Sequence, residues 1–189
     1  SWQQKSINFS KLDLEKNKKL LYNSDFILVN DGWINSINFE SFQNINNLFT
    51  NYKLNNRAKD FLKEFKENQI NKLFPLGIIP YAVIIKNNKD LIQKASNSWD
   101  FLLAKKLKGK IIFPQSPRII MSISKKISVK DSLSKLKGQS MLFDDQNAIN
   151  WLINSQANVA IIPYSQCVKY QKIDSRLSIV FPNKGVPLI

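Results

Sequence analysis

Histidine is absent from this 189-residue sequence, and cysteine occurs once, as Cys167. Without an imidazole the chain cannot form a Ser-His or Cys-His catalytic unit, and it lacks the commonest metal ligand in proteins. A single cysteine also excludes an intrachain disulfide. We therefore expect no catalysis, no metal site and no cofactor. We expect Cys167 to be a small buried side chain rather than a reactive thiol.

Glycine (5) and proline (7) are scarce, which argues against a collagen-like or low-complexity chain. No apolar run approaches the 18 residues of a membrane-spanning helix, and no signal peptide precedes the rest. We therefore expect a mature protein or a trimmed piece of one. The composition is 43% hydrophobic with 12 phenylalanines, which is ample for one large domain or two small lobes.

Acidic residues are few, and the formal net charge is +14. Residues 1–90 carry 13 Lys/Arg against 9 Asp/Glu, whereas residues 91–189 carry 15 against 5. Such a balance is compatible with nucleic acid, an acidic membrane surface or anionic ligands. No run reaches five like charges, and most aromatics fall at core positions of amphipathic patterns. We therefore favour a solvated basic surface over a nucleic-acid-binding stripe.

Short apolar runs with strand character alternate with amphipathic helical patterns. This alternation predicts an α/β fold with mainly parallel strands. Trp99 and Trp151 fall at helical spacing with other apolar residues, so we expect both in the core. The predicted strands are 25–29, 81–85, 110–113, 158–162 and 178–181; the predicted helices are 53–68, 99–107, one beginning at Pro117, 132–137 and 148–153.

Ligands bind outside the carboxyl ends of strands in open α/β sheets, so the residues that follow each strand are candidates for a binding site. They are hydrogen-bonding and aromatic groups, not a matched acid, base and nucleophile, and this suits binding better than turnover. The candidates are Asn30, Asp31, Trp33, Gln115, Ser116, Arg118, Asp144, Asp145 and Tyr164.

Each candidate also has a purely structural interpretation. The Asp31 region can be a turn followed by a core tryptophan. Ser116 can be only a helix cap, with Arg118 a solvated helix residue. Asp144 and Asp145 can cap the helix that follows them, and Tyr164 can be packing at a hinge.

Taken in order, several segments resemble the type 2 periplasmic solute-binding proteins of ABC transporters, nearest to the spermidine/putrescine and iron branch. The resemblance extends from about residue 20 to residue 189. Its motifs are SDFILVNDGW (24–33), SWDFLLAKKLKGKIIFP (98–114), LINSQANVAIIPYS (152–165) and FPNKGVPLI (181–189). Each motif is weak alone, and their order and spacing make the resemblance moderately specific.

The resemblance implies a two-lobed α/β fold, with mainly parallel sheets flanked by helices, that closes on a solute like a hinge. The second lobe would be residues 82–163. The first would combine 1–81 with 164–189 and would be incomplete. The strand and helix that open this lobe in the family, and the part that continues beyond the GVP tail, have no counterpart here. The implied function is capture of a small molecule and delivery to an ABC permease, by a monomer in the periplasm or another extracytoplasmic space that meets the membrane only through the transporter.

The alternative is a cytoplasmic effector-binding domain of the same fold, as in LysR-type regulators. The ligand also stays open at this stage. Arg118 in the first turn of a helix favours an anion, whereas Asp31, Asp144 and Asp145 would attract a cation. The loop at 115–118 lacks the carboxylate that polyamine binders carry there.

Overall fold

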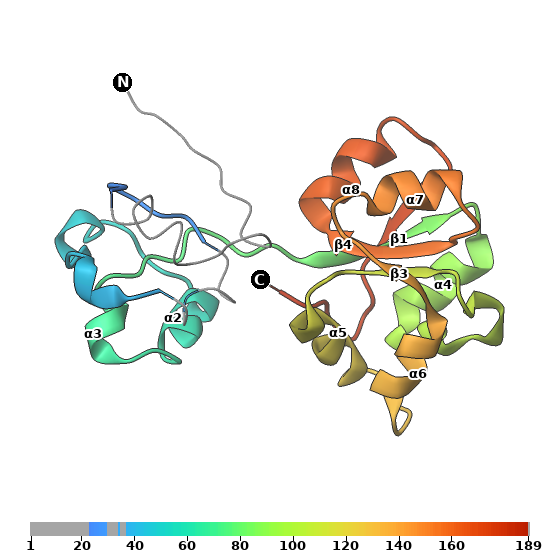
Figure 1. Ribbon diagram of the computed structural model, residues 1–189, viewed down its shortest axis with the longest axis horizontal. Helices are drawn as coiled ribbons and strands as arrows, with labels where there is room; N and C mark the ends of the chain where they lie inside the picture. The colour runs from blue at the N-terminus through green and yellow to red at the C-terminus, as the bar shows by residue number, and fades with distance from the viewer. Residues whose placement is uncertain (1–22, 30–33, 35–36, 189) are drawn as a thin grey trace. The chain divides into compact units, whose positions relative to one another are not determined.

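The structure is a computed structural model that describes residues 23–29, 34 and 37–188. The chain divides into two compact units, Ser1–Leu76 and Gly77–Ile189 (Figure 1). Among the described residues, no helix is both long and apolar enough to cross a membrane.

The first unit contains only short helical elements in its described part. They are η3 (Phe39–Ser41), η4 (Asn46–Leu48), α2 (Asn56–Leu62) and α3 (Glu67–Ile70). Three aromatic rings hold its chain segments together, with Phe49 stacked on Phe74 at 4.0 Å between centroids and Tyr52 edge-on to Phe74 at 5.9 Å. Polar contacts add to this cluster, because the Lys72 ammonium donates to the Phe39 carbonyl at 2.7 Å.

Two sequence predictions for this unit are wrong. Residues 25–29 form no strand, and Leu28 is 77% exposed. No strand among the described residues pairs with this run, and a strand needs a neighbouring strand to form. The helix predicted over 53–68 is instead two short helices, α2 and α3, with a break between Leu62 and Glu67.

The second unit contains every strand of the described chain, in one five-stranded sheet. Its strands are β1 (Tyr81–Lys86), β2 (Ile111–Phe113), β3 (Ser140–Phe143), β4 (Val159–Pro163) and β5 (Leu177–Val180). Its helices are α4 (Lys89–Asn97), η5 (Trp99–Leu103), η6 (Lys105–Leu107), α5 (Pro117–Ser124), α6 (Ser132–Gln139), α7 (Ala148–Asn154) and α8 (Tyr164–Gln171).

The strand order is β3-β2-β4-β1-β5, and the sheet is mixed. β2 runs parallel to both β3 and β4, as the alternating pattern predicted. β1 is antiparallel to both β4 and β5, so the expectation of mainly parallel strands is wrong for half of the pairs. The pattern of apolar runs cannot show this, because a buried strand reads alike in both directions.

Alternate residues of each strand face opposite layers of helices, as the period of two requires. In β1, Val83 and Ile85 pack with α4, η5 and α5, whereas Ala82 and Ile84 pack with α7 and α8. The two helical layers lie on opposite sides of the sheet (Figure 1). This arrangement makes the second unit a three-layer α/β/α sandwich.

The segment SWDFLLAKKLKG forms two 3₁₀ turns, η5 and η6, instead of the single helix predicted. The segment begins at a cap, because the Ser98 hydroxyl accepts from the Asp100 amide at 3.1 Å, and it ends before Gly109, whose φ of +67° suits glycine. Trp99 is fully buried, as predicted. Trp151 is 45% exposed, so its assignment to the core is wrong; Ala148, Ile149 and Leu152 form the buried face of α7.

The observed grouping also differs from the lobes predicted from the sequence. Residues 164–180 lie in the second unit together with 82–163, rather than returning to a first lobe with 1–81. The reason is the antiparallel pairing of β5 with β1, in which Val83 lies opposite Val180. β5 thereby becomes an edge strand of the only sheet in the described chain.

Asp100, at the start of η5, ties three segments of the second unit together. Its carboxylate accepts from the Ser128 amide at 2.7 Å and from the Lys184 ammonium at 3.3 Å, and it also hydrogen-bonds the Ser98 hydroxyl. Burial alone would raise the pKa of Asp100, but these hydrogen bonds outweigh it and lower the pKa to about 2.

Replacing Asp100 with Asn should therefore destabilise the fold by about 1–2 kcal/mol at pH 7. This lies at the low end of the roughly 1.5–3 kcal/mol typical of hydrogen bonds to a charged group, because the Asp100 side chain is 34% exposed. Because the folded-state pKa is lowered, this contribution is present above the unfolded pKa of roughly 4 and is lost as the pH falls through about 2. Urea unfolding at pH 7 and pH 2 measures both values. An equal loss at the two pH values would contradict the assignment. Asp90→Asn, in an exposed ion pair, is the control with little expected effect.

Cys167 is fully buried on α8, as the sequence predicted, and its thiol lies 3.6 Å from the Pro163 carbonyl oxygen. Burial raises the pKa of the thiol to about 12. Since the thiolate is the reactive form, the native protein should not react with Ellman's reagent at pH 8 and should show one thiol per chain after unfolding in guanidinium. Fast reaction of the native protein would refute this.

Candidate functional site

The carboxyl ends of β2, β3 and β4 lie at one edge of the sheet, because these three strands are parallel neighbours. Antiparallel pairing brings two more strand ends to the same edge. The first residue of β1, Tyr81, lies opposite Pro163 at the end of β4, and β5 reaches this edge with its last residues. We call this the carboxyl edge of the sheet.

Asp144, directly after β3, organises the loop at this edge. Its backbone amide donates to the Phe113 carbonyl at 2.9 Å, and its carboxylate accepts from the amides of Gln146 and Asn147 at 2.9 and 3.0 Å. The Trp151 indole adds a fourth contact at 3.3 Å. Burial would raise the pKa of Asp144, but the hydrogen bonds outweigh it and hold the pKa below its usual value. This carboxylate is engaged in holding the loop before α7.

Asp145 has the opposite electrostatic environment. It is half-buried, and burial raises the pKa of its carboxyl group, to which the neighbouring charge of Asp144 adds. Hydrogen bonds from its own amide and from the Tyr81 hydroxyl work against this rise without cancelling it. Asp145 is therefore a carboxylate whose negative charge the protein itself stabilises poorly.

Aromatic side chains are also present at the carboxyl edge. The amide of Tyr164 donates to the carbonyl of Pro80 at 2.8 Å, which places Tyr164 beside the start of β1. Its ring meets the ring of Phe181 edge-on, with 5.1 Å between centroids. Tyr164 is 38% exposed and Phe181 44%, so both rings keep faces open to solvent. Tyr164 and Phe181 thus form a partly exposed aromatic pair at the same edge of the sheet as Tyr81.

The loop after β2 also reaches the carboxyl edge. Ser116 precedes α5 with Pro117 at its first position, as predicted, although the serine side chain makes no capping hydrogen bond. Gln115 and Arg118 are exposed. Arg118 carries its positive charge in the first turn of α5.

The structure therefore brings six of the nine predicted residues to one edge of one sheet: Gln115, Ser116, Arg118, Asp144, Asp145 and Tyr164. The remaining three, Asn30, Asp31 and Trp33, lie outside the described residues.

Sequence reasoning missed Tyr81 and Phe181. Candidates drawn from the residues that follow a strand do not include Tyr81, which begins β1. Phe181 falls inside the strand predicted over 178–181, whereas β5 ends at Val180. A tyrosine as the first residue of an otherwise aliphatic run (YAVII) was an available signal, because its hydroxyl needs a polar partner when buried.

In the described part of the chain no three His, Cys, Asp or Glu residues are grouped closely enough to hold a metal ion. The carboxyl edge offers a carboxylate, a guanidinium and aromatic faces. This set can recognise a small molecule by charge and by ring contact.

A crystal structure of an ABC transporter protein from Clostridium perfringens superposes on 92% of this chain and 60% of its own, at 15% identity and a TM-score of 0.61. The chain has the fold of the type 2 periplasmic binding proteins. The apo structure of FutA2 from Synechocystis matches 79% of this chain and 54% of its own, at 12% identity and a TM-score of 0.50.

A putative spermidine/putrescine ABC transporter protein from Listeria monocytogenes matches 72% of this chain and 49% of its own, at 17% identity and a TM-score of 0.49. The chain thus spans about half to three fifths of the length of these three proteins. No protein-family model matches the sequence, and a search of curated proteins finds no match. The two-lobed fold class expected from the sequence motifs is confirmed.

Replacing Tyr81 with Phe should raise the pKa of Asp145 further, because it removes a hydrogen bond that favours the ionised carboxylate. Carbon-13 NMR of the aspartate carboxyl groups during a pH titration measures this directly. Tyr164→Phe is the matched control at the same edge and should leave the titration of Asp145 unchanged. An unaltered Asp145 pKa in Tyr81→Phe would disprove the contact.

Proposed function

We propose that this chain captures a small solute at the carboxyl edge of its sheet and delivers it to an ABC permease, without chemistry. The observation that carries the proposal is Asp145, a half-buried carboxylate with a raised pKa at the edge where open α/β sheets bind ligands. The similarity of fold to an ABC transporter protein from Clostridium perfringens supports the transport role and, with it, an extracytoplasmic location.

The chemistry of the edge favours a solute with a positively charged nitrogen. Asp144 is engaged by four hydrogen bonds, which leaves Asp145 as the carboxylate able to accept a new partner. A bound cation would lower the free energy of the ionised form, which the protein alone disfavours. Tyr164 and Phe181 would cover the apolar part of such a solute and attract its charge through their ring faces.

Arg118 provides the alternative, since it would select a solute with a carboxylate or phosphate group. A zwitterion could use both side chains. The two charges therefore define which solutes to compare: di- and polyamines, choline-like cations, amino acids and organic acids.

A thermal-shift screen of the full chain against these classes, followed by calorimetric titration of each positive, tests the proposal. Cationic solutes should raise Tm, and Asp145→Asn should weaken their binding by about tenfold or more, the scale of one charge-assisted contact. Asp145→Asn should also raise Tm in the absence of ligand at pH 7. Because the folded-state pKa of Asp145 is raised, its carboxyl group stabilises the fold less as the pH rises through that pKa. Asparagine carries no charge, so the variant avoids this loss of stability.

Asp131→Asn is the matched control, because it removes the same charge at an exposed residue whose φ of +55° asparagine tolerates well. Equal binding by Asp145→Asn and Asp131→Asn would refute the cation assignment. If only organic acids bind, and Arg118→Gln abolishes that binding, then the ligand is recognised by the Arg118 guanidinium and not by Asp145. No shift with any class would refute solute binding at this edge.

A further inference from the structure

Residues 181–188, which we call the strap, leave the sheet at the end of β5 and return to it beside the start of β1. They form no helix or strand of their own. The pairing of β5 with β1 ends where Val180 lies opposite Val83. Further toward the start of β1, the Tyr81 amide donates instead to the Pro187 carbonyl at 2.9 Å. The strap therefore replaces β5 as the neighbour of β1 at this end.

The direction of the Tyr81 amide follows from the alternation of hydrogen bonds along β1. Even-numbered residues bond toward β4, as the Lys86 amide does when it donates to the Asn158 carbonyl at 3.0 Å. Odd-numbered residues bond toward β5, as the Asn87 amide does when it donates to the Arg176 carbonyl at 2.9 Å. Because successive backbone groups of a central strand face opposite neighbours, the amide of Tyr81 faces the β5 side, where the strap supplies its acceptor.

The two ends of the strap hold two residues of the carboxyl edge. Phe181 begins the strap, and its ring meets the ring of Tyr164 with 5.1 Å between centroids. Tyr81 is bonded to the other end, and its hydroxyl hydrogen-bonds the carboxyl group of Asp145. One segment therefore determines where an aromatic face and the hydroxyl partner of the carboxylate lie.

The middle of the strap is fixed to the core through Trp99. This residue is fully buried, and its indole N–H donates to the Gly185 carbonyl at 2.8 Å. A tight turn presents that carbonyl, since the Gly185 amide donates to the Pro182 carbonyl at 2.9 Å and Gly185 has a φ of +78° that suits glycine. The Lys184 ammonium adds an exposed contact, to the Ser128 hydroxyl at 2.8 Å. A buried N–H is costly to leave unpaired, so the bond between Trp99 and Gly185 holds the strap in place.

We propose that Trp99 is a positioning residue for the carboxyl edge: its indole fixes the strap, and the strap keeps Tyr81 and Phe181 where a solute would meet them. The role is indirect, because Trp99 acts through the Gly185 carbonyl and not on the solute. That this positioning serves recognition rests on the proposed function, whereas the positioning itself is measured without a solute.

Amide hydrogen exchange of the full chain is the first test. Trp99→Phe keeps an aromatic ring in the core and removes the indole N–H. The amides of Tyr81 and of Asn183, which donates to the Ser96 carbonyl at 2.8 Å, should then exchange about fivefold faster relative to the Ile112 amide of β2. Equal acceleration at all three amides would indicate a loss of global stability alone and would overturn the proposal.

The titration of Asp145, followed by carbon-13 NMR, is the second test. A displaced Tyr81 bonds Asp145 less well, so Trp99→Phe should raise the pKa of Asp145 in the same direction as Tyr81→Phe and by a smaller amount. Ile111→Val is the stability control, because it trims the same core cluster on β2, two strands away from β1, and should leave this titration unchanged. An unaltered Asp145 pKa in Trp99→Phe would overturn the proposal.

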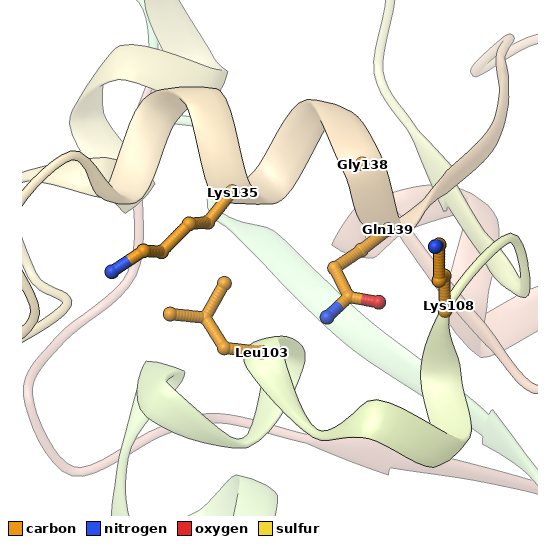
Figure 2. A pocket seen from close by; sticks show the side chains of 5 residues that line it. All are labelled: Leu103, Lys108, Lys135, Gly138 and Gln139. Atoms are coloured by element: carbon orange, nitrogen blue, oxygen red, sulfur yellow. The ribbon is translucent and has the colours of Figure 1, made fainter.

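Gly185→Ala tests the strap without altering the core. A side chain at a φ of +78° is strained, so the turn should loosen and the Asp145 titration should shift as it does in Trp99→Phe. Gly138→Ala is the matched control. Gly138 lies in the last turn of α6 (Figure 2), where an added Cβ atom meets nothing within 4 Å, and the variant should leave Asp145 unchanged. A folded Gly185→Ala with an unaltered Asp145 pKa would contradict the role of the strap.

Calorimetric titration with a cationic solute separates this inference from the proposed function. If such a solute binds, Trp99→Phe should weaken its binding several-fold although Asp145 is still present. An unchanged affinity in a variant whose Asp145 titration has shifted would refute the role in recognition. If no solute binds the unaltered chain, the proposed function fails, and the exchange and titration results still decide whether Trp99 positions the edge.

Discussion

The antiparallel insertion of β1 between β4 and β5 is the constraint on which the rest of the second unit depends. It connects the parallel strands β2, β3 and β4 to β5, and it contributes Val83 and Ile85 to one core layer and Ala82 and Ile84 to the other. It also reverses the usual relation between strand end and sheet edge, since the start of β1 meets the carboxyl ends of its neighbours. Tyr81 becomes part of the candidate site for this reason.

The adjacent carboxylates after β3 show how neighbouring residues can separate in role. Asp144 is surrounded by donors and fixes the loop ahead of α7, so its charge is stabilised by the protein. Asp145 is partly desolvated and lies beside that fixed charge, so its own charge is disfavoured. Asp144 therefore stabilises the fold, whereas the ionised form of Asp145 is unfavourable and a bound cation would stabilise it.

The two edges of the sheet differ in charge as well as in strand direction. The carboxyl edge carries Asp145 and aromatic rings, whereas a shallow depression beside the amino ends of β2 and β3 is lined by Lys108 and Lys135. Residues 77–189 carry 17 Lys/Arg and 6 Asp/Glu, a net +11. Much of this excess lies on exposed lysines, which form the solvated basic surface expected from the sequence.

The sequence by itself determined the alternation of strands and helices, the start of α5 at Pro117, the burial of Cys167 and Trp99, and the residues that follow the parallel strands. These depend on local periodicity and on turn chemistry, which neighbouring residues encode. The tertiary structure alone decided strand direction, the exposure of Trp151, the splitting of the helices at 53–68 and 99–107, and the contact between Tyr81 and Asp145. Each depends on what a segment packs against, and partners distant in the chain leave no local pattern. The charge of Asp145 is readable in the sequence, but its raised pKa follows from burial beside Asp144, which only the folded chain creates.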